Sequence, residues 1–562
     1  MFNKWVNKES DLKEVKRIAK EHDISLFKAL LLHNRGIDYI EPFLNPSIEA
    51  THDPSLFYEA NKTASIVLRA VKKNIPIIIY GDYDCDGITS VALMQHALSK
   101  LKANVHPYFN NRFAEGYSVC PEGIDEIVKK HGTPSLVITV DNGISGHSAA
   151  ERARELGVGL IITDHHELPR ELPKANAIFH PHLGDYPFRS LAGVGIAFKL
   201  IQLVYRALGH EKEASMFLDL VALGTVADVA PLIDENHALV KMGLDLMNNN
   251  PRIPFSILKR TAGLKGKVNS YTLGFMYGPM INAQGRLEGK PEDALEVLLI
   301  RKTKDWDKGV AYAKKLLELN NQRKKLLEKQ TELADSLVKD QLNKQSIVLA
   351  NEKFHEGVVG LIASRLREAY YRPVLVLTKA EEDLWKGSGR SINSFSLIDA
   401  LRSSEEFLQG YGGHKVAAGL SIKESDIPSF AQRIEDLAST LTEDDLTPRI
   451  YLDGILSSTE VTSNLLEDII SLEPFGVGFT RPKFLIKNIS TNETSVFGRE
   501  NEHIKITQPF FEVILWRGGQ DNVNLPGAID IIGHLGRSNY SDNLQVTIED
   551  FSDANLSLVG NG

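Results

Sequence analysis

The chain has 562 residues, of which 43% are hydrophobic and 24% charged, an ordinary composition for a soluble globular protein of several domains. Its 64 basic and 73 acidic residues give a formal net charge of −9, which argues against a protein that coats nucleic acid through bulk positive charge. Two cysteines exclude a disulfide framework and an all-cysteine zinc site. No apolar run is long enough to cross a membrane, and no secretory signal is visible. We therefore expect a cytoplasmic protein without a membrane partner.

The first half of the chain predicts a parallel sheet. Residues 1–50 suggest short amphipathic helices closed by a turn region at Pro42–Pro46. From about 60 to 230, apolar runs alternate with helical periodicity, which is typical of βαβ units whose sheet is covered on both faces. The predicted strands are 75–80, 104–109, 135–140, 158–163 and 176–179, and the predicted helices are 88–101, 121–131 and 145–156.

The second half changes character twice. Residues 301–331 carry ten Lys or Arg against four Asp or Glu and predict a long basic connecting helix. A second α/β unit follows, with strands at 347–350, 373–378 and 384–392 and helices at 357–370 and 396–403. After a helix at 460–472, the strands 483–489, 503–507, 510–516, 527–534 and 544–550 predict an all-β unit, for which a small OB-like barrel is a plausible fold.

These changes divide the chain into five regions. The predicted regions are a helical segment (1–50), a first α/β domain (51–255), a helical region with the basic connector (256–345), a second, smaller α/β domain (346–445) and the OB-like domain (446–562). The fold class is therefore α/β with a C-terminal β-barrel.

Acidic residues follow several predicted strands of the first domain. Asp82, Asp84 and Asp86 alternate directly after one strand, Asp141 follows a second, and Asp164-His165-His166 follows a third. Asp228 comes after a predicted helix, so its place beside them is an inference. In open α/β sheets the site lies beyond the carboxyl ends of the strands, so these residues are expected to converge.

So many carboxylates in one crevice would repel one another unless their pKa values rise or a multivalent cation neutralises them. Carboxylates and imidazoles without thiolates suit Mn²⁺ or Mg²⁺, and this many ligands suits two ions. Simpler interpretations exist. Asp82 to Gly87 matches half of an EF-hand loop, but Leu93 stands where that loop needs Glu. Asp141 alone could cap a helix, and Asp164 to His166 alone could form a solvated turn. Residues 192–198 predict a tight turn that enters a helix rather than a dinucleotide loop.

Together, these motifs resemble in order and spacing the four motifs of the DHH phosphoesterases, a family named after Asp164-His165-His166. The second α/β unit resembles the DHHA1 domain through Gly412-Gly413-His414 and 354–360. Residues 111–113, 278–287 and 387–390 are similar to the branch of the family that degrades single-stranded DNA from its 5′ end. The resemblance extends from about residue 30 to the end of the chain.

The resemblance implies roles for each motif residue. Asp84 would bind one ion, Asp86, His165 and Asp228 the other, and Asp141 would bridge them. Asp82 would be a ligand or would orient one. Asp164 would orient its neighbouring histidine, and His166 would face the scissile phosphate, so that Asp141, Asp164 and His166 form the catalytic set. Related enzymes place a histidine where this chain has Tyr80, which leaves the first ion fewer ligands.

The substrate side is also implied by the resemblance. Arg112, Ser388 and Arg390 correspond to a pocket for a terminal 5′-phosphate, which suits the planar fork of arginine. His414 follows two glycines that let the backbone approach a ligand. Asn282 and Arg286 would contact the DNA strand near the metal site. Surface ion pairs, turn hydrogen bonds and a loop-stabilising histidine are the structural alternatives for these residues.

The implied activity is a 5′→3′ exonuclease that hydrolyses single-stranded DNA in repair and recombination, with two Mn²⁺ or Mg²⁺ ions as cofactors. A helicase and a single-strand-binding protein are the expected protein partners. An oligoribonuclease or cyclic-dinucleotide phosphodiesterase, an inorganic pyrophosphatase and an inactive scaffold of the same fold remain as alternatives. The basic connector and the aromatics of the last domain could contact DNA or serve only as a solvated face and a core; these aromatics are Phe484, Phe510, Phe511, Trp516 and Tyr540.

Overall fold

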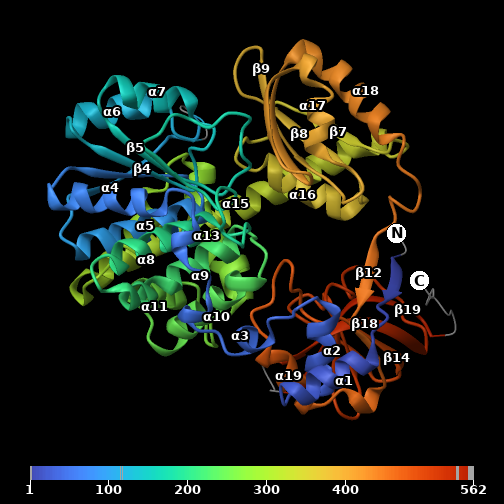
Figure 1. Ribbon diagram of the computed structural model, residues 1–562. Helices are drawn as coiled ribbons and strands as arrows, with labels where there is room; N and C mark the ends of the chain where they lie inside the picture. The colour runs from blue at the N-terminus through green and yellow to red at the C-terminus, as the bar shows by residue number, and fades with distance from the viewer. Residues whose placement is uncertain (1–2, 114–115, 117, 539–542, 555–562) are drawn as a thin grey trace. The chain divides into compact units, whose positions relative to one another are not determined.

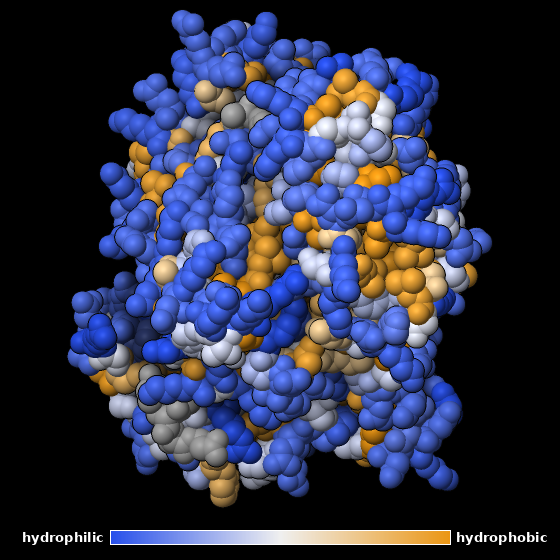
Figure 2. Space-filling view, turned by 90° about the vertical axis from the view of Figure 1, so that its left-hand side faces the viewer, coloured by the Kyte–Doolittle hydropathy of each residue, from blue (hydrophilic) through white to orange (hydrophobic). Residues whose placement is uncertain are grey.

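The computed structural model describes residues 3–113, 116, 118–538 and 543–554. Contacts between residues divide these into two compact units. One contains residues up to Asn7 together with Asn321–Leu452, and the other contains Lys8–Asn320 together with Asp453–Ala554. Among the described residues, no helix combines the length and the apolar character that a membrane crossing requires. Figure 2 shows one face of the molecule, on which hydrophilic residues predominate and hydrophobic residues appear in patches.

The predicted parallel sheet is confirmed. Its five strands have the order β3-β2-β4-β5-β6, and all pairs are parallel. The strands are β2 (Ile77–Gly81), β3 (Val105–Phe109), β4 (Leu136–Val140), β5 (Gly159–Thr163) and β6 (Ala177–Phe179). β2 and β4 are buried along their whole length, because helices cover both faces of the sheet.

The two faces have different covers (Figure 1). On one face, Ile77, Ile79 and Ile138 pack with residues of α4 (Ala60–Lys72), α5 (Cys85–Lys100) and α8 (Gly193–Arg206). On the other face, Ile78 and Val137 pack with residues of α6 (Pro121–His131) and α7 (His147–Glu155). Alternate residues of each strand therefore feed two separate cores.

Helices follow this sheet. They are α9 (Leu218–Ala227), α10 (Asp234–Asn249), α11 (Ile253–Thr261), α12 (Ser270–Thr272), a π-helical turn (Leu273–Tyr277), α13 (Gly278–Leu287), α14 (Glu292–Leu298) and α15 (Trp306–Val338). α15 is the predicted basic connector, and it is a continuous helix of 33 residues. Its apolar side is buried at Leu316 and Leu327, while Lys314, Lys324 and Lys325 are exposed.

The second α/β domain has a mixed five-stranded sheet of order β10-β11-β9-β8-β7. Its strands are β7 (Ile347–Ala350), β8 (Val374–Lys379), β9 (Leu384–Arg390), β10 (Leu408–Gly413) and β11 (Ala417–Lys423). α16 (Val359–Tyr370) packs against one face, and α17 (Leu397–Arg402) and α18 (Ile427–Ala438) pack against the other. This unit also contains a two-stranded parallel sheet, in which β1 (Lys4–Asn7) pairs with β12 (Arg449–Leu452). The N-terminal strand is absent from the predicted elements.

The predicted all-β unit is also confirmed. One seven-stranded sheet has the order β13-β14-β18-β19-β17-β16-β15, with α19 (Ser463–Ser471) before its second strand. The strands are β13 (Gly454–Leu456), β14 (Phe484–Ser490), β15 (Thr494–Phe497), β16 (His503–Thr507), β17 (Glu512–Leu515), β18 (Ala528–Arg537) and β19 (Leu544–Asp553). Phe484 and Phe511 belong to its core, whereas Phe510 and Trp516 are exposed. Tyr540 lies outside the described residues.

The N-terminal helices join this sheet domain to the first domain. They are α1 (Leu12–Glu21), α2 (Leu26–Asn34) and α3 (Ile40–Leu44). The ring of Phe43 stacks on His237 of α10 at 3.8 Å between centroids and also contacts Phe479. The predicted turn at Pro42–Pro46 is partly wrong, because Pro42 lies in the first turn of α3. Proline is tolerated there, since the first turn of a helix has no backbone acceptor for its N–H.

Candidate metal centre

Three strand ends of the parallel sheet place acids side by side. β4 lies between β2 and β5, and the register aligns Gly81 with Val140 and Val140 with Thr163. The next residue of each strand is an aspartate, namely Asp82, Asp141 or Asp164. All three are buried. The parallel register therefore brings together residues that are far apart in the chain.

The first turn of α5 adds two more carboxylates. Asp84 caps this helix, because its Oδ1 accepts hydrogen bonds from the backbone N–H groups of Asp86 (2.9 Å) and Gly87 (3.1 Å). Asp86 accepts from the N–H groups of Gly193 (2.6 Å) and Val194 (2.8 Å), at the start of α8. The predicted turn into a helix at 192–198 is thus confirmed, and its backbone holds Asp86. No EF-hand loop forms, because helix α5 begins at Cys85.

Asp141 occupies the centre of the cluster. Its backbone is left-handed, with φ of 62°, a conformation that costs energy for a residue other than glycine. Its Oδ1 lies 3.1 Å from Nε2 of His165 but has no hydrogen-bond partner, although it is fully buried. Gly193 permits this packing, since a Cβ atom there would lie 2.6 Å from Cβ of Asp141. A buried oxygen without a donor is the kind of group that a cation would satisfy.

Asp164 has hydrogen-bond donors around both oxygens. It accepts from the N–H groups of Ile144 (2.9 Å), His165 (2.7 Å) and His166 (3.1 Å), and from Nδ1 of His166 (2.7 Å). Burial opposes ionisation, but the hydrogen bond and charge of His166 hold the pKa of Asp164 below its usual value. Asp164 therefore holds the ring of His166 and the backbone of His165.

Asp228 enters the cluster from a helix, not from a strand. It is the C-cap of α9, and its N–H donates to the carbonyl of Gly224 (2.8 Å). Gly224 lies close under the site, because a Cβ atom there would stand 3.0 Å from Oδ1 of Asp86. The end of α9 thus supplies the fourth motif without a strand of its own.

The side chains fall into three overlapping groups, in each of which the ligand atoms lie within 4.8 Å of one another. The groups are Asp82-Asp84-Asp141, Asp86-His165-Asp228 and Asp141-His165-His166. The first two contain all six residues that the sequence proposes as ligands, and Asp141 and His165 connect them. His166, assigned to the substrate side by sequence, also stands within reach of this centre.

Crowding and burial strongly affect these carboxyl groups. Burial, with the charges of neighbouring aspartates, raises the pKa of Asp82 and of Asp141 well above the usual value. The same causes raise the pKa of Asp86 to about 7 and that of Asp228 to about 8. Oxygen and imidazole donors of this kind fit Mn²⁺ or Mg²⁺, whose charge would allow the carboxylates to ionise together.

Tyr80 does not take part in this centre. Its side chain lies in the core formed with α6 and α7, where its hydroxyl donates to Oδ1 of Asn110. Burial raises the pKa of the hydroxyl far above its usual value, so Tyr80 stays neutral. Its place in the core explains why no ligand comes from this position of β2.

Arg112, Asn282 and Arg286, which are proposed to contact the DNA strand, lie near residues 83–85. The guanidinium of Arg112 stands 4.5 Å from the Tyr83 ring centroid, and its positive charge acts on Asp82. Burial and the charge of Arg112 lower the pKa of Arg286. Asn282 has a local role, because its Oδ1 accepts from the N–H of Cys85 (2.6 Å) and so supports the start of α5.

The proposed phosphate residues of the second α/β domain lie near one end of its sheet. The guanidinium of Arg390 donates to Oγ of Ser388 (3.1 Å) and to the carbonyl of Gly389 (2.7 Å). Gly360, in the first turn of α16, faces both side chains, since a Cβ atom there would lie 3.0 Å from Oγ of Ser388. His414 is exposed, and its N–H donates to the carbonyl of Ala417, the residue opposite Arg390.

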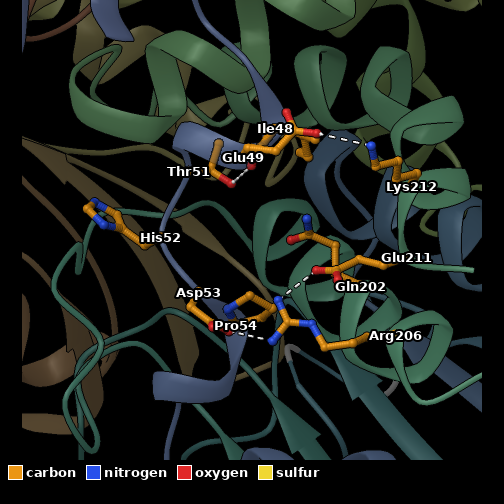
Figure 3. A pocket seen from close by; sticks show the side chains of 10 residues that line it. All are labelled: Ile48, Glu49, Thr51, His52, Asp53, Pro54, Gln202, Arg206, Glu211 and Lys212. Carbon is orange, nitrogen blue, oxygen red and sulfur yellow. Dashed lines mark hydrogen bonds and ion pairs between the residues drawn. The ribbon is translucent and has the colours of Figure 1, made fainter. Parts of the chain in front are cut away.

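A separate cavity of about 300 Å³ lies away from these groups, between residues 48–54 and the end of α8 (Figure 3). Its charges are paired with one another. Arg206 contacts Asp53 (2.7 Å) and Glu211 (2.6 Å), and Lys212 lies 3.8 Å from Glu49. Because the cations and carboxylates neutralise each other, this cavity lacks the concentrated negative charge of the metal centre.

Sequence reasoning misses the glycines that shape the centre. Gly193 and Gly224 leave room for Asp141 and Asp86, and Gly285 of α13 packs on Tyr83, where a Cβ atom would lie 2.6 Å from the Tyr83 carbonyl oxygen. The glycine-rich run at 192–195 is the one available signal. Its spacing indicates a turn, but it does not indicate that the backbone N–H groups of this turn bind the carboxylate of Asp86.

Three known families match the chain. The DHH family, N-terminal domain, matches residues 76–225, the DHHA1 domain matches 343–440, and the RecJ OB domain matches 452–550. The single-stranded-DNA-specific exonuclease RecJ of Bacillus subtilis is 36% identical over 90% of this chain, and the RecJ of Escherichia coli is 34% identical over 75%. The chain spans 64% of the Bacillus subtilis protein and 77% of the Escherichia coli protein.

Solved structures agree with this assignment. The crystal structure of Thermus thermophilus RecJ in complex with Mn²⁺ covers 98% of this chain with a TM-score of 0.84 and 29% identity, and the chain covers 79% of it. The RecJ of Thermus thermophilus is 33% identical over 87% of this chain, which covers 70% of that relative. Since the DHH, DHHA1 and OB regions also occur in this order, the chain belongs to the RecJ family of DHH phosphoesterases.

Proposed function

We propose that the protein is a metal-dependent exonuclease that hydrolyses single-stranded DNA from its 5′ end. The main support is the buried cluster around Asp141, in which two groups of three ligands share one edge of a parallel sheet. Its relatives are named single-stranded-DNA-specific exonucleases, and one of them has been crystallised with Mn²⁺ and with Mg²⁺.

The ligand groups suggest a division of work. Asp82, Asp84 and Asp141 would hold one divalent cation, and Asp86, His165 and Asp228 the other. When bound, such ions supply a nucleophilic water at neutral pH and stabilise negative charge on the phosphate. The chain itself contributes rigidity: the first turns of α5 and α8 hold Asp84 and Asp86 through backbone N–H groups.

His166 would contact the scissile phosphate. Its ring is held by Asp164, whose Oδ1 lies 2.7 Å from Nδ1 of His166, and Asp164 is held in turn by the N–H of Ile144. Such an anchored ring stays in place when a phosphate arrives, so little ordering is required at the moment of reaction. Arg112 and Arg286 would add positive charge beside the bound DNA strand.

Ser388 and Arg390 would bind the 5′-phosphate. Both side chains face Gly360 in the first turn of α16, where backbone N–H groups and the helix dipole favour an anion. His414 would add a donor near the same end of the sheet. We further propose that the enzyme acts in the cytoplasm, together with a helicase and a single-strand-binding protein that supply its substrate.

The test compares a long single strand, the matching duplex and a dinucleotide, each with Mn²⁺. We expect mononucleotide release from the 5′ end of the single strand and much slower hydrolysis of the other two. Chelation of the metal should stop the reaction. If the dinucleotide were hydrolysed rapidly while the long single strand remained intact, the proposal would be overturned. That result would favour an oligonucleotide phosphodiesterase.

A further inference from the structure

Two aromatic side chains project into solvent close to the metal centre. Tyr271 is 64% exposed and Phe275 is 68% exposed. Their rings stack on each other, with centroids 4.8 Å apart and planes inclined by 24°. Two large stacked rings with so much exposed surface are unusual, because burial of such rings normally stabilises a fold.

The backbone beneath the pair is irregular but well anchored. Phe275 lies in the π-helical turn Leu273–Tyr277, and turns of this kind are frequent at functional sites. Leu273 and Tyr277 are buried, while Ser270 donates to the carbonyl of Phe475 (2.7 Å). The wider turn buries these two residues and leaves the aromatic pair outside.

This segment packs directly on the last turn of α9. A Cβ atom on Gly278 would lie 2.9 Å from Cβ of Ala227, and one on Gly274 would lie 3.5 Å from a methyl group of Val226. The residue after Ala227 is Asp228, a member of the metal centre. Val229 follows Asp228 and is 63% exposed.

The surrounding charge suits nucleic acid. Lys265 and Lys267, in the loop that leads to Tyr271, are exposed and form no ion pair with any residue that the structure describes. On the other side, α13 continues from the π-helical turn to Asn282 and Arg286. Cations beside exposed rings are the usual arrangement of a surface that binds single strands through phosphates and bases.

We propose that Tyr271 and Phe275 form a stacking platform for a nucleobase of the bound single strand, next to the metal centre. This inference rests on the proposed function and adds a positioning role to it. The platform would hold the strand through a base face, which every base offers, and so would act without reading sequence. A duplex keeps its bases stacked inside and could not use it.

A purely structural role makes a different prediction. Aromatic residues four positions apart stabilise a helix through contact of their rings. If that were their only role, their removal would lower the melting temperature and would affect every substrate equally. A platform instead affects only substrates that carry a base at the position that it contacts.

The experiment measures binding by the metal-free protein, so that catalysis plays no part. A set of single strands carries one abasic residue, moved stepwise from the 5′ end. With the wild type, we expect the abasic residue to weaken binding about tenfold at one or two positions. In Phe275→Ala and Tyr271→Ala, that position-specific loss should disappear. Leu208→Ala, which removes another exposed apolar side chain, should keep it.

Several outcomes separate the proposals. Identical abasic profiles in the wild type and both variants would overturn the platform, even if the wild type degrades single strands. A wild type that binds with this profile but releases no mononucleotides with Mn²⁺ would instead contradict the proposed function. Melting curves check the fold. If Phe275→Ala melts early, Phe275→Leu keeps the apolar volume and should still lose the profile.

Discussion

The two α/β domains carry opposite charges near the ends of their strands. In the first sheet, Asp82, Asp141 and Asp164 follow β2, β4 and β5 and come together with raised or lowered pKa values. In the second sheet, β9 ends with Ser388 and Arg390, which face the start of α16. In both domains the side chains lie at strand ends and helix starts, and the residue types decide whether such a site suits a cation or an anion.

The largest effect on activity is expected at the acidic edge, which is the set of aspartates that follow β2, β4 and β5. Asp141→Asn should reduce exonuclease activity to background, because Asp141 belongs to two of the three ligand groups and its carboxylate is removed. The metal-free variant should melt no earlier than the wild type, since a buried and crowded carboxyl group has been made neutral. At a hundred times its dissociation constant, a cation adds about 2.7 kcal/mol to the free energy of unfolding of the wild type. That gain should shrink in the variant.

Differential scanning calorimetry with and without Mn²⁺ checks this prediction. Asp125→Asn serves as the matched control, because Asp125 is a solvent-exposed partner of Arg152 in the same domain. The control should keep both the activity and the metal-induced rise in melting temperature. Full activity in a well-folded Asp141→Asn protein would mean that Asp141 does not hold a catalytic metal ion.

A smaller effect on activity is expected at the basic edge, which is formed by Ser388 and Arg390 at the end of β9. Arg390→Ala should reduce kcat/KM on 5′-phosphorylated strands by roughly tenfold to a hundredfold, since hydrogen bonds to charged groups contribute about 1.5–3 kcal/mol. Strands with a 5′-hydroxyl end should be affected much less, and Mn²⁺ binding should not change. Arg402→Ala removes an exposed arginine of the same domain and should behave as the wild type. An equal reduction on both kinds of end would contradict the phosphate pocket.

A buried histidine of the first half of the chain makes the stability of the fold depend on pH. His96 is buried, its Nε2 donates to the carbonyl of Leu298 (2.9 Å), and its Nδ1 accepts from Nε of Arg301 (2.8 Å). Burial and the charges of Arg252 and Arg301 lower its pKa to about 3. Between pH 6.5 and 3, His96 therefore binds a proton in the unfolded chain but not in the folded chain. The free energy of unfolding decreases as the pH falls through this range.

Urea unfolding at several pH values checks this. In His96→Gln, the fall in the free energy of unfolding below pH 6.5 should be less steep, by at most about 1.4 kcal/mol per pH unit. His147→Gln, at the exposed first position of α7, should keep the wild-type slope. An unchanged slope in the His96 variant would assign the acid sensitivity to other groups, such as buried His237, whose pKa burial also lowers.

The smallest effect is expected for the basic connector. Lys315 is already paired with Asp293 (2.6 Å), whereas Lys314, Lys324 and Lys325 are exposed. Reversing these three charges should lower the salt dependence of binding to single-stranded DNA, by a log–log slope of about 0.7 for each phosphate that the variant no longer neutralises. Titrations at several salt concentrations measure the slope. An unchanged slope would make this face of α15 a solvated surface only.

The sequence predicts the local part of this structure well. The strands before Asp82, Asp141 and Asp164 are apolar runs of the right length, and parallel pairing then aligns their ends without further information. The position of Asp228 is harder to predict, because it depends on how Gly224 lets α9 pack close to Asp86. Likewise, Asp86 is held by the N–H groups of Gly193 and Val194, which are 107 and 108 residues away, and no local pattern encodes such an interaction.

The paired β1 and β12 have a consequence for biosynthesis. Residues 4–7 leave the ribosome long before their hydrogen-bond partners, residues 449–452, which emerge after the domains between them have been made. The first strand must therefore wait, unpaired, while those domains fold. A bulky fusion placed directly before residue 4 would therefore lie next to the strand that pairs last.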